Sequence, residues 1–136
     1  MTYMVYISFH KGEDRIRYSF LSHLSASLRR KGLISSSSFV HHSSNEIKIE
    51  KTKFKAFLVV ISWKYVLSAE CLDELAEIAD QNVVVPVFYC ITQSDVKHQC
   101  RLDILRDTFP LEDYSAERVS RWIYALNKTT KSYKLR

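Results

Sequence analysis

Short apolar runs alternate with amphipathic segments along the 136-residue chain, and this alternation constrains the fold more than any other feature. The runs at residues 3–9, 57–62 and 83–89 are rich in β-branched and aromatic side chains, as is typical of buried strands. Weaker strands are predicted at residues 33–40, which are rich in serine, and at residues 108–111.

The run at residues 83–89 is continuously apolar instead of alternating with polar residues. Continuity indicates that both faces are covered, which predicts a central strand of a parallel sheet. Pro86 conflicts with that prediction, because proline has no N–H to donate to a strand ladder.

Helical spacing appears between these strands. Residues 16–31 carry an apolar side chain at every fourth position, which predicts a helix closed by Gly32. Further helices are predicted after Ser68 and at residues 115–128, each with a serine as its N-terminal cap. A short helix is predicted at residues 47–53, and residues 94–105 are helical or irregular. Strands alternating with helices predict an α/β fold with a parallel sheet between helices.

Composition excludes several classes of protein. The chain has two glycines, so it cannot form a glycine-rich phosphate-binding turn. Its three cysteines contain no CxxC pair, so we expect free thiols in a reducing compartment. The longest apolar run, at residues 83–91, is shorter than the ~18 residues of a membrane-spanning helix. The N-terminus lacks a basic leader, so no signal peptide and no membrane contact are expected.

The net charge of +5 belongs to the C-terminal segment. Residues 115–136 hold six basic residues and one acidic residue, so residues 1–114 are neutral overall. We expect one domain at residues 1–128, followed by a basic tail at residues 129–136. The tail could contact nucleic acid, but no nucleic-acid-binding motif accompanies it, so a solubilising end or a linker is the favoured interpretation.

Ligands of open parallel sheets bind at the carboxyl ends of the strands, which places candidate residues in the loops that follow them. Glu74 lies beside the apolar stripe of its predicted helix, so its carboxylate could be partly desolvated and directed into a cleft. The alternative is a solvated helix face. Trp63, at a strand end, either packs or lines a pocket. No histidine or cysteine spacing is typical of a metal site, and none is predicted.

Several strings occur in a fixed order along the chain. They are VYISF (5–9), GED (12–14), FLSHL (20–24), LVVIS (58–62), CLDEL (71–75), VPVFY (85–89) and SDV (94–96). Over residues 3–128 they resemble the TIR domain of plant intracellular immune receptors. The resemblance implies a flavodoxin-like, three-layer fold with a five-stranded parallel sheet, and the family has its own proline where Pro86 stands.

The resemblance also implies an enzyme that cleaves NAD+ at the nicotinamide–ribose bond. NAD+ would be the substrate, with no cofactor, and Glu74 would be the catalytic residue. Phe9, Gly12 and Trp63 would belong to the NAD+ pocket. Nicotinamide is already a cationic leaving group, so a single carboxylate can suffice to stabilise the oxocarbenium-like ribose. Such domains act in the cytoplasm, with the nucleus as a second location.

Partner binding is the other property that the resemblance implies. Ser22 and His23 match a pair through which TIR domains associate, as homo- or hetero-oligomers. Three departures from the family pattern stand out: no arginine precedes Gly12, Glu70 replaces a common tryptophan, and the serine-rich segment at residues 35–46 is short and lacks an Arg-Gly pair. Only the short segment concerns catalysis, because in the family it borders the NAD+ pocket and builds the active assembly. The alternative function is therefore a catalytically silent adaptor that acts by TIR–TIR interaction.

Overall fold

A computed structural model describes residues 3–37, 54, 56–80 and 82–131 of the chain. Its described strands form one parallel sheet with the order β2-β1-β3-β4. The strands are β1 (Tyr3–Ser8), β2 (Leu33–Ser37), β3 (Ala56–Ile61) and β4 (Val84–Phe88). The helices are the π-helical turn η1 (Ile16–Phe20), α1 (Leu21–Arg30), α2 (Trp63–Val66), α3 (Ala69–Ala79), α4 (Gln93–Gln99), α5 (Leu102–Thr108) and α6 (Ala116–Lys131).

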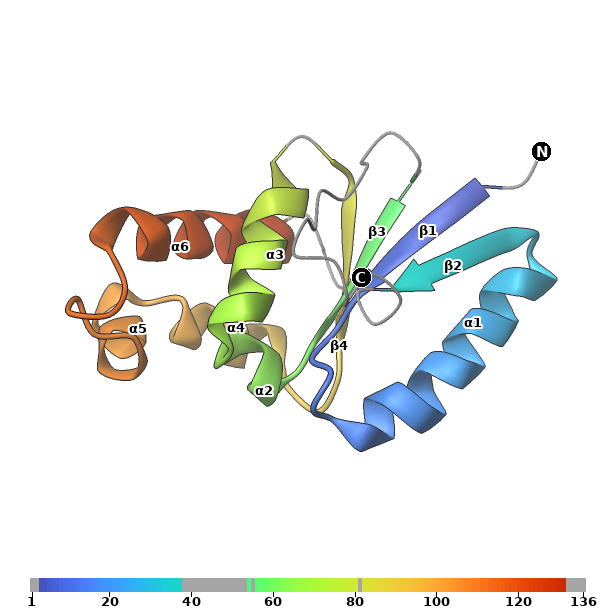
Figure 1. Ribbon diagram of the computed structural model, residues 1–136, viewed down its shortest axis with the longest axis horizontal. Helices are drawn as coiled ribbons and strands as arrows, with labels where there is room; N and C mark the ends of the chain where they lie inside the picture. Colours follow the sequence, from blue (N-terminus) through green and yellow to red (C-terminus); the bar gives the residue numbers. More distant parts are fainter. Residues whose placement is uncertain (1–2, 38–53, 55, 81, 132–136) are drawn as a thin grey trace.

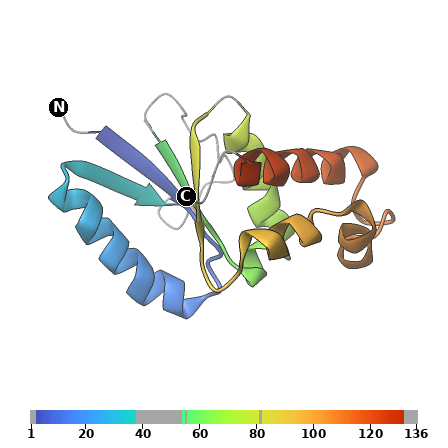
Figure 2. The same cartoon turned by 180° about the vertical axis from the view of Figure 1, so that it is seen from behind.

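Helices cover both faces of the sheet, which gives three layers (Figure 1). Helix α1 lies on one side, while α3 and α6 lie on the other, and Figure 2 shows the same separation from behind. The alternation of β3 explains this arrangement, because successive side chains point to opposite faces. Phe57, Val59 and Ile61 are buried in the cluster that contains α3 and α6, whereas Val60 is buried in the cluster beneath α1. The α/β prediction is thereby confirmed.

The predicted helix ends are confirmed for the first helix and for α3. Gly32 has a φ of +80°, a left-handed conformation that favours glycine, and its N–H donates to the Arg29 carbonyl. The Ser68 hydroxyl accepts a hydrogen bond from the Cys71 N–H at 3.3 Å, which caps α3. The Ser115 hydroxyl accepts one from the Arg118 N–H at 3.1 Å, and α6 continues beyond the predicted residue 128 to Lys131.

The strand predicted at residues 108–111 is wrong, and the described residues contain four strands. The Phe109 N–H donates to the Leu105 carbonyl, which continues the bonding pattern of α5. The Pro110 carbonyl then accepts from the N–H groups of Asp113 and Tyr114, which closes a turn. These local hydrogen bonds occupy the backbone groups that a strand ladder would need.

The predicted central position of β4 is also wrong for the described sheet. β4 pairs with β3 and forms an edge of that sheet, and Val85 is 39% exposed. An edge position accommodates Pro86, because a missing N–H costs nothing where it faces away from a neighbouring strand. The apolar run is instead explained by Val84 and Phe88, which pack against the buried core.

The serine-laden second strand is confirmed as β2, which pairs in parallel with β1. The predicted helix at residues 47–53 and most of the serine-rich segment lie outside the described residues. Among the helices that the structure describes, none combines the length and the apolar character needed to cross a membrane.

Candidate active site

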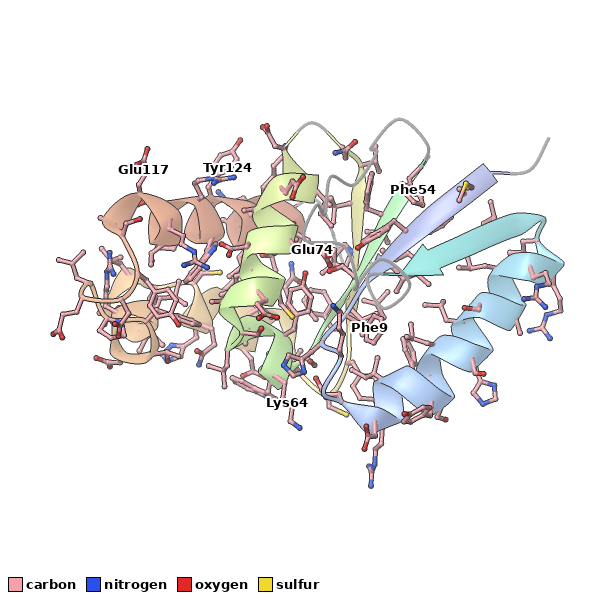
Figure 3. All side chains as sticks on the ribbon, viewed as in Figure 1. Phe9, Phe54, Lys64, Glu74, Glu117 and Tyr124 are labelled. Carbon is pink, nitrogen blue, oxygen red and sulfur yellow. The ribbon has the colours of Figure 1, made fainter. Side chains whose placement is uncertain are left out.

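Glu74 lies in the middle of α3, against β1, and reaches Ser8, the last residue of that strand. Ligands of open parallel sheets bind beyond such strand ends. The Glu74 side chain extends from α3 toward the sheet (Figure 3). The Tyr6 hydroxyl donates a hydrogen bond to Glu74 Oε2 at 2.9 Å, and the Ser8 hydroxyl donates one to Glu74 Oε1. Both carboxylate oxygens are therefore held by side chains of β1.

Tyr65 extends this arrangement by one step. Its hydroxyl lies 2.8 Å from Ser8 Oγ, and both residues are fully buried. Since Ser8 has one hydroxyl hydrogen and donates it to Glu74, Tyr65 must be the donor to Ser8. Burial raises the pKa of Tyr65 well above its usual value, so this tyrosine keeps its proton.

The surroundings of Glu74 raise the pKa of its carboxyl group. Burial is the largest cause, because it disfavours the charged form. The hydrogen bonds from Ser8 and Tyr6 and the charge of Lys11 act in the opposite direction. A carboxylate in such a site is weakly solvated, so its attraction for a positive charge is stronger than in water.

The three residues predicted to line a substrate pocket lie in different environments. Phe9 is 2% exposed and packs with Ile7, Ile16 and Val60, so its side chain belongs to the core. Gly12 is exposed and its N–H donates to His10 Nδ1 at 3.1 Å. Any Cβ at that position would lie 2.7 Å from the same imidazole ring.

Trp63 is 41% exposed at the start of α2. The preceding residue, Ser62, donates a hydrogen bond to the carboxylate of Glu13, in the loop that follows β1. This contact brings the loop that contains Gly12 to the beginning of α2. The loop after β1 and the start of α2 therefore meet at the carboxyl ends of β1 and β3. The part of Gly12 and Trp63 in an NAD+ pocket stays a prediction.

Sequence reasoning missed Tyr6, Ser8 and Tyr65 as site residues. A signal was present in β1, because residues two apart in a strand share a face. Tyr6 and Ser8 are the polar-tipped members of a strand in which Val5 and Ile7 take the other face. A serine buried at the end of an apolar strand needs a partner, and Glu74 supplies it.

Ser22 and His23 are exposed on α1. Helix α1 lies on the opposite side of the sheet from α3, which carries Glu74 (Figures 1 and 2). The predicted interface residues and the predicted catalytic residue are therefore on separate faces of the molecule.

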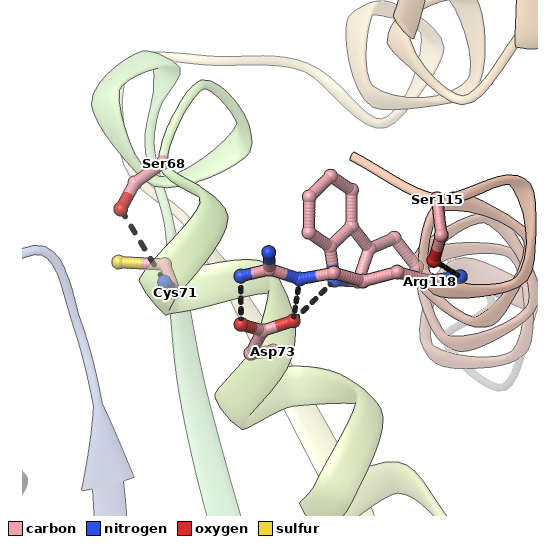
Figure 4. A network of polar contacts seen from close by, with 6 residues as sticks. Ser68, Cys71, Asp73, Ser115 and Arg118 are labelled. Carbon is pink, nitrogen blue, oxygen red and sulfur yellow. Dashed lines mark hydrogen bonds and ion pairs between the residues drawn. The ribbon is translucent and has the colours of Figure 1, made fainter. Parts of the chain in front are cut away.

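Asp73, the neighbour of Glu74, points in another direction and joins α3 to α6 (Figure 4). Arg118 donates to its carboxylate at 3.0 Å from Nε and at 2.5 Å from Nη2, and the Trp122 indole N–H donates at 2.8 Å. The Arg118 guanidinium also lies over the rings of Tyr114 and Trp122, 5.3 and 5.2 Å from their centroids. The CLDEL string thus contributes one carboxylate to helix packing and one to the candidate site.

A hollow of about 490 Å³ lies between α3 and α6, and Glu74 is not among its lining residues. Glu77, Asp80 and Glu117 line it together with Arg121 and Tyr124. Figure 3 shows Glu117 and Tyr124 directed outward from α6. Within the described part of the chain, no group of histidine, cysteine or acidic side chains is arranged to hold a metal ion.

The parallel sheet with helices on both faces, and the Glu74 carboxylate held against its strand β1, define a three-layer α/β protein with a candidate site beside the sheet. The sequence model of the TIR domain family matches residues 2–135, and the chain belongs to that family. This finding confirms the resemblance on which the expectations of fold and immune signalling rest.

Proteins of plant disease resistance are among its relatives. The chain is 36% identical over 131 residues to probable disease resistance protein At4g19520 of Arabidopsis thaliana, covering 90% of this chain and 7% of that protein. It is 34% identical over 134 residues to probable disease resistance protein RPP1 of the same plant, covering 90% of this chain and 11% of that protein. The chain thus spans a small part of the length of these relatives.

A solved structure agrees with this assignment. The TIR domains of the activated Roq1 resistosome, which directly recognises the pathogen effector XopQ, match with a TM-score of 0.69 and 29% sequence identity. The match covers 95% of this chain and 84% of that one. The protein is accordingly a TIR domain of the type found in plant immune receptors.

Proposed function

We propose that this TIR domain hydrolyses NAD+ to nicotinamide and an ADP-ribose-type product, with Glu74 as its catalytic residue. The observation that carries the proposal is the half-buried Glu74 carboxylate, which is held by two hydroxyl donors of β1, one of them Ser8 at the carboxyl end of that strand. A weakly solvated carboxylate near a strand end, where ligands of open parallel sheets bind, suits the stabilisation of a cationic transition state.

The chemistry requires little more than a fixed negative charge. When the bond between C1 of the ribose and the nicotinamide nitrogen breaks, both bonding electrons leave with the nitrogen. Nicotinamide departs as a neutral molecule, while positive charge develops on the ribose. The Glu74 carboxylate stabilises that charge or orients a ribose hydroxyl, and water then adds to C1 and releases a proton. Gly12 and Trp63, in the segments that follow β1 and β3, would contact the dinucleotide.

Nicotinamide release from NAD+ tests this proposal at high protein concentration. We expect release by the unaltered domain and its loss in Glu74→Gln, which keeps the side-chain size but removes the charge. Glu70→Gln is the matched control, because Glu70 is an exposed acid on the same helix. Equal turnover by the unaltered domain and Glu74→Gln would refute the assignment of Glu74.

The second candidate function is that of an adaptor without catalysis, which binds another TIR domain through α1. It is supported by the exposure of Ser22 and His23 on a helix that lies across the sheet from Glu74. This function predicts a TIR–TIR complex that is lost in His23→Ala, with no nicotinamide release by either form. Unchanged binding of the partner by His23→Ala would show that another surface is used.

A further inference from the structure

The two hydroxyl groups that hold Glu74 come from one strand, and the surrounding rings fix one of them. Tyr6 is fully buried, and its ring meets Phe54 edge-on, with centroids 5.2 Å apart and planes at 74°. The ring of Phe57 lies on another side, with a centroid distance of 5.9 Å. Phe54 packs against the same core cluster as the buried residues of α3. Because these rings restrict Tyr6, its O–H has a defined direction toward Glu74.

The second hydroxyl group is fixed by a hydrogen bond. Ser8 accepts from Tyr65 and donates to Glu74 Oε1, so its single hydrogen is committed to the carboxylate. Tyr65 is fully buried in α2, a helix that begins at the carboxyl end of β3. Two separate elements, β1 and α2, therefore determine where the oxygens of Glu74 lie.

Apolar side chains would pack as well on this face of β1, so the hydroxyl groups need an explanation. A buried hydroxyl without a partner is unfavourable, and so is a buried carboxylate without donors. Each group relieves the other most strongly while Glu74 is ionised and turned toward β1, because a neutral carboxyl accepts hydrogen bonds less strongly. The two donors thus favour one charge state and one orientation, whereas burial opposes the charge.

We propose that Tyr6 and Ser8 are positioning residues, which favour the ionised form of the Glu74 carboxylate and hold it in a single orientation against β1. The consequence for catalysis rests on the proposed function, whereas the effect on the ionisation of Glu74 does not. Other groups also face this carboxylate: Lys11 from the loop after β1, Glu77 from α3 itself, and the thiol of Cys71 beside Tyr65. None of them changes in the variants chosen below.

The direct test is an NMR titration of the Glu74 side-chain carboxyl carbon in the whole domain. Tyr6→Phe keeps the aromatic ring between Phe54 and Phe57 and removes only the hydroxyl. Ser8→Ala removes the other donor, and it serves as the second variant if Tyr6→Phe does not fold. We expect the titration of Glu74 to move to higher pH in both variants, because each lacks a donor that favours the charged form.

Tyr65→Phe is the matched control, since it also removes one buried tyrosine hydroxyl but leaves both donors to Glu74 in place. Its Glu74 titration should stay closer to that of the unaltered domain than the titration of either variant. Unchanged titration of Glu74 in Tyr6→Phe and Ser8→Ala would overturn the proposal, whether or not the domain cleaves NAD+.

Kinetics provide a second readout. If nicotinamide is released, kcat should fall about tenfold in Tyr6→Phe with little change in KM, which is the scale of one lost hydrogen bond to a charged group. The acidic limb of the rate profile should move to higher pH, because more Glu74 is protonated at a given pH. An unshifted profile with a lower rate would indicate a structural role and contradict the proposal. Absence of release by the unaltered domain would refute the proposed function alone.

Discussion

Asp73 offers a quantitative test of how the candidate site is supported, because it joins α3 to α6. Its ion pair with Arg118 is partly open to water, with 38% and 44% of the Arg118 and Asp73 side chains exposed. Exposed pairs typically contribute about 0.2–1 kcal/mol, and the two hydrogen bonds between Arg118 and Asp73 place this pair near the upper end of that range. The larger effect comes from Trp122, which is 1% exposed and donates its indole N–H to the same carboxylate.

Removing the carboxylate would leave that buried N–H without its acceptor, at a cost of about 1–3 kcal/mol. We therefore expect Asp73→Ala to lower the free energy of unfolding by about 2 kcal/mol, which corresponds to a decrease in Tm of about 6 °C for a domain of this size. Urea unfolding, followed by tryptophan fluorescence, measures the first quantity, and a thermal scan measures the second.

Two further variants separate the contributions. Asp73→Asn keeps an oxygen for Trp122 and removes the charge, and Arg118→Leu removes the cation and keeps the Asp73–Trp122 bond. Each should destabilise the domain by about 1 kcal/mol or less. The reasoning would be refuted if Arg118→Leu were as destabilising as Asp73→Ala, because the ion pair would then outweigh the buried indole bond.

Three other predictions concern backbone, thiols and pH. Gly32→Ala should lower the free energy of unfolding by about 1 kcal/mol in urea titrations, because Gly32 has a φ of +80°; an unchanged midpoint would contradict this. Exposed Cys90 should react with a thiol reagent at pH 8 before Cys71, whose pKa burial raises to about 12; mass spectrometry of the labelled peptides decides the order. Burial raises the pKa of Glu74, so near pH 5 the folded state binds more protons at this residue than the unfolded state does. The contribution of Glu74 to the free energy of unfolding should therefore fall as pH rises above 4.5. Unfolding at pH 5 and pH 8 should show a larger loss for the unaltered domain than for Glu74→Gln, and equal losses would contradict the cause assigned to the shift.

The sequence predicted those parts of the fold that depend on local patterns. Apolar runs located β1, β3 and β4, and the four-residue spacing located α1, because burial requires a continuous apolar face. The caps at Ser68 and Ser115 were also predictable from local sequence, because a serine at a helix start accepts a hydrogen bond from the backbone N–H three residues further on.

The strand at residues 108–111 was predicted wrongly for a local reason, because the Pro110 carbonyl closes a turn with Asp113 and Tyr114. Predictions that depended on distant contacts were incomplete. Glu74 was identified as a candidate from its place on the helix, yet its partners Tyr6 and Ser8 lie 68 and 66 residues away in the chain. No local pattern links positions so far apart, so the hydroxyl groups that hold the carboxylate became visible only in the fold.

The central proposal is that this TIR domain hydrolyses NAD+ with a single catalytic carboxylate, that of Glu74. The most direct measurement is the rate of nicotinamide release from NAD+ by the unaltered domain and by Glu74→Asp at equal, high protein concentration. Aspartate keeps the charge but is one methylene shorter, so its oxygens cannot occupy the positions that Tyr6 and Ser8 define. The account predicts release by the unaltered domain and a loss of at least tenfold in Glu74→Asp. Equal rates for the two forms, or no release by the unaltered domain, would contradict it.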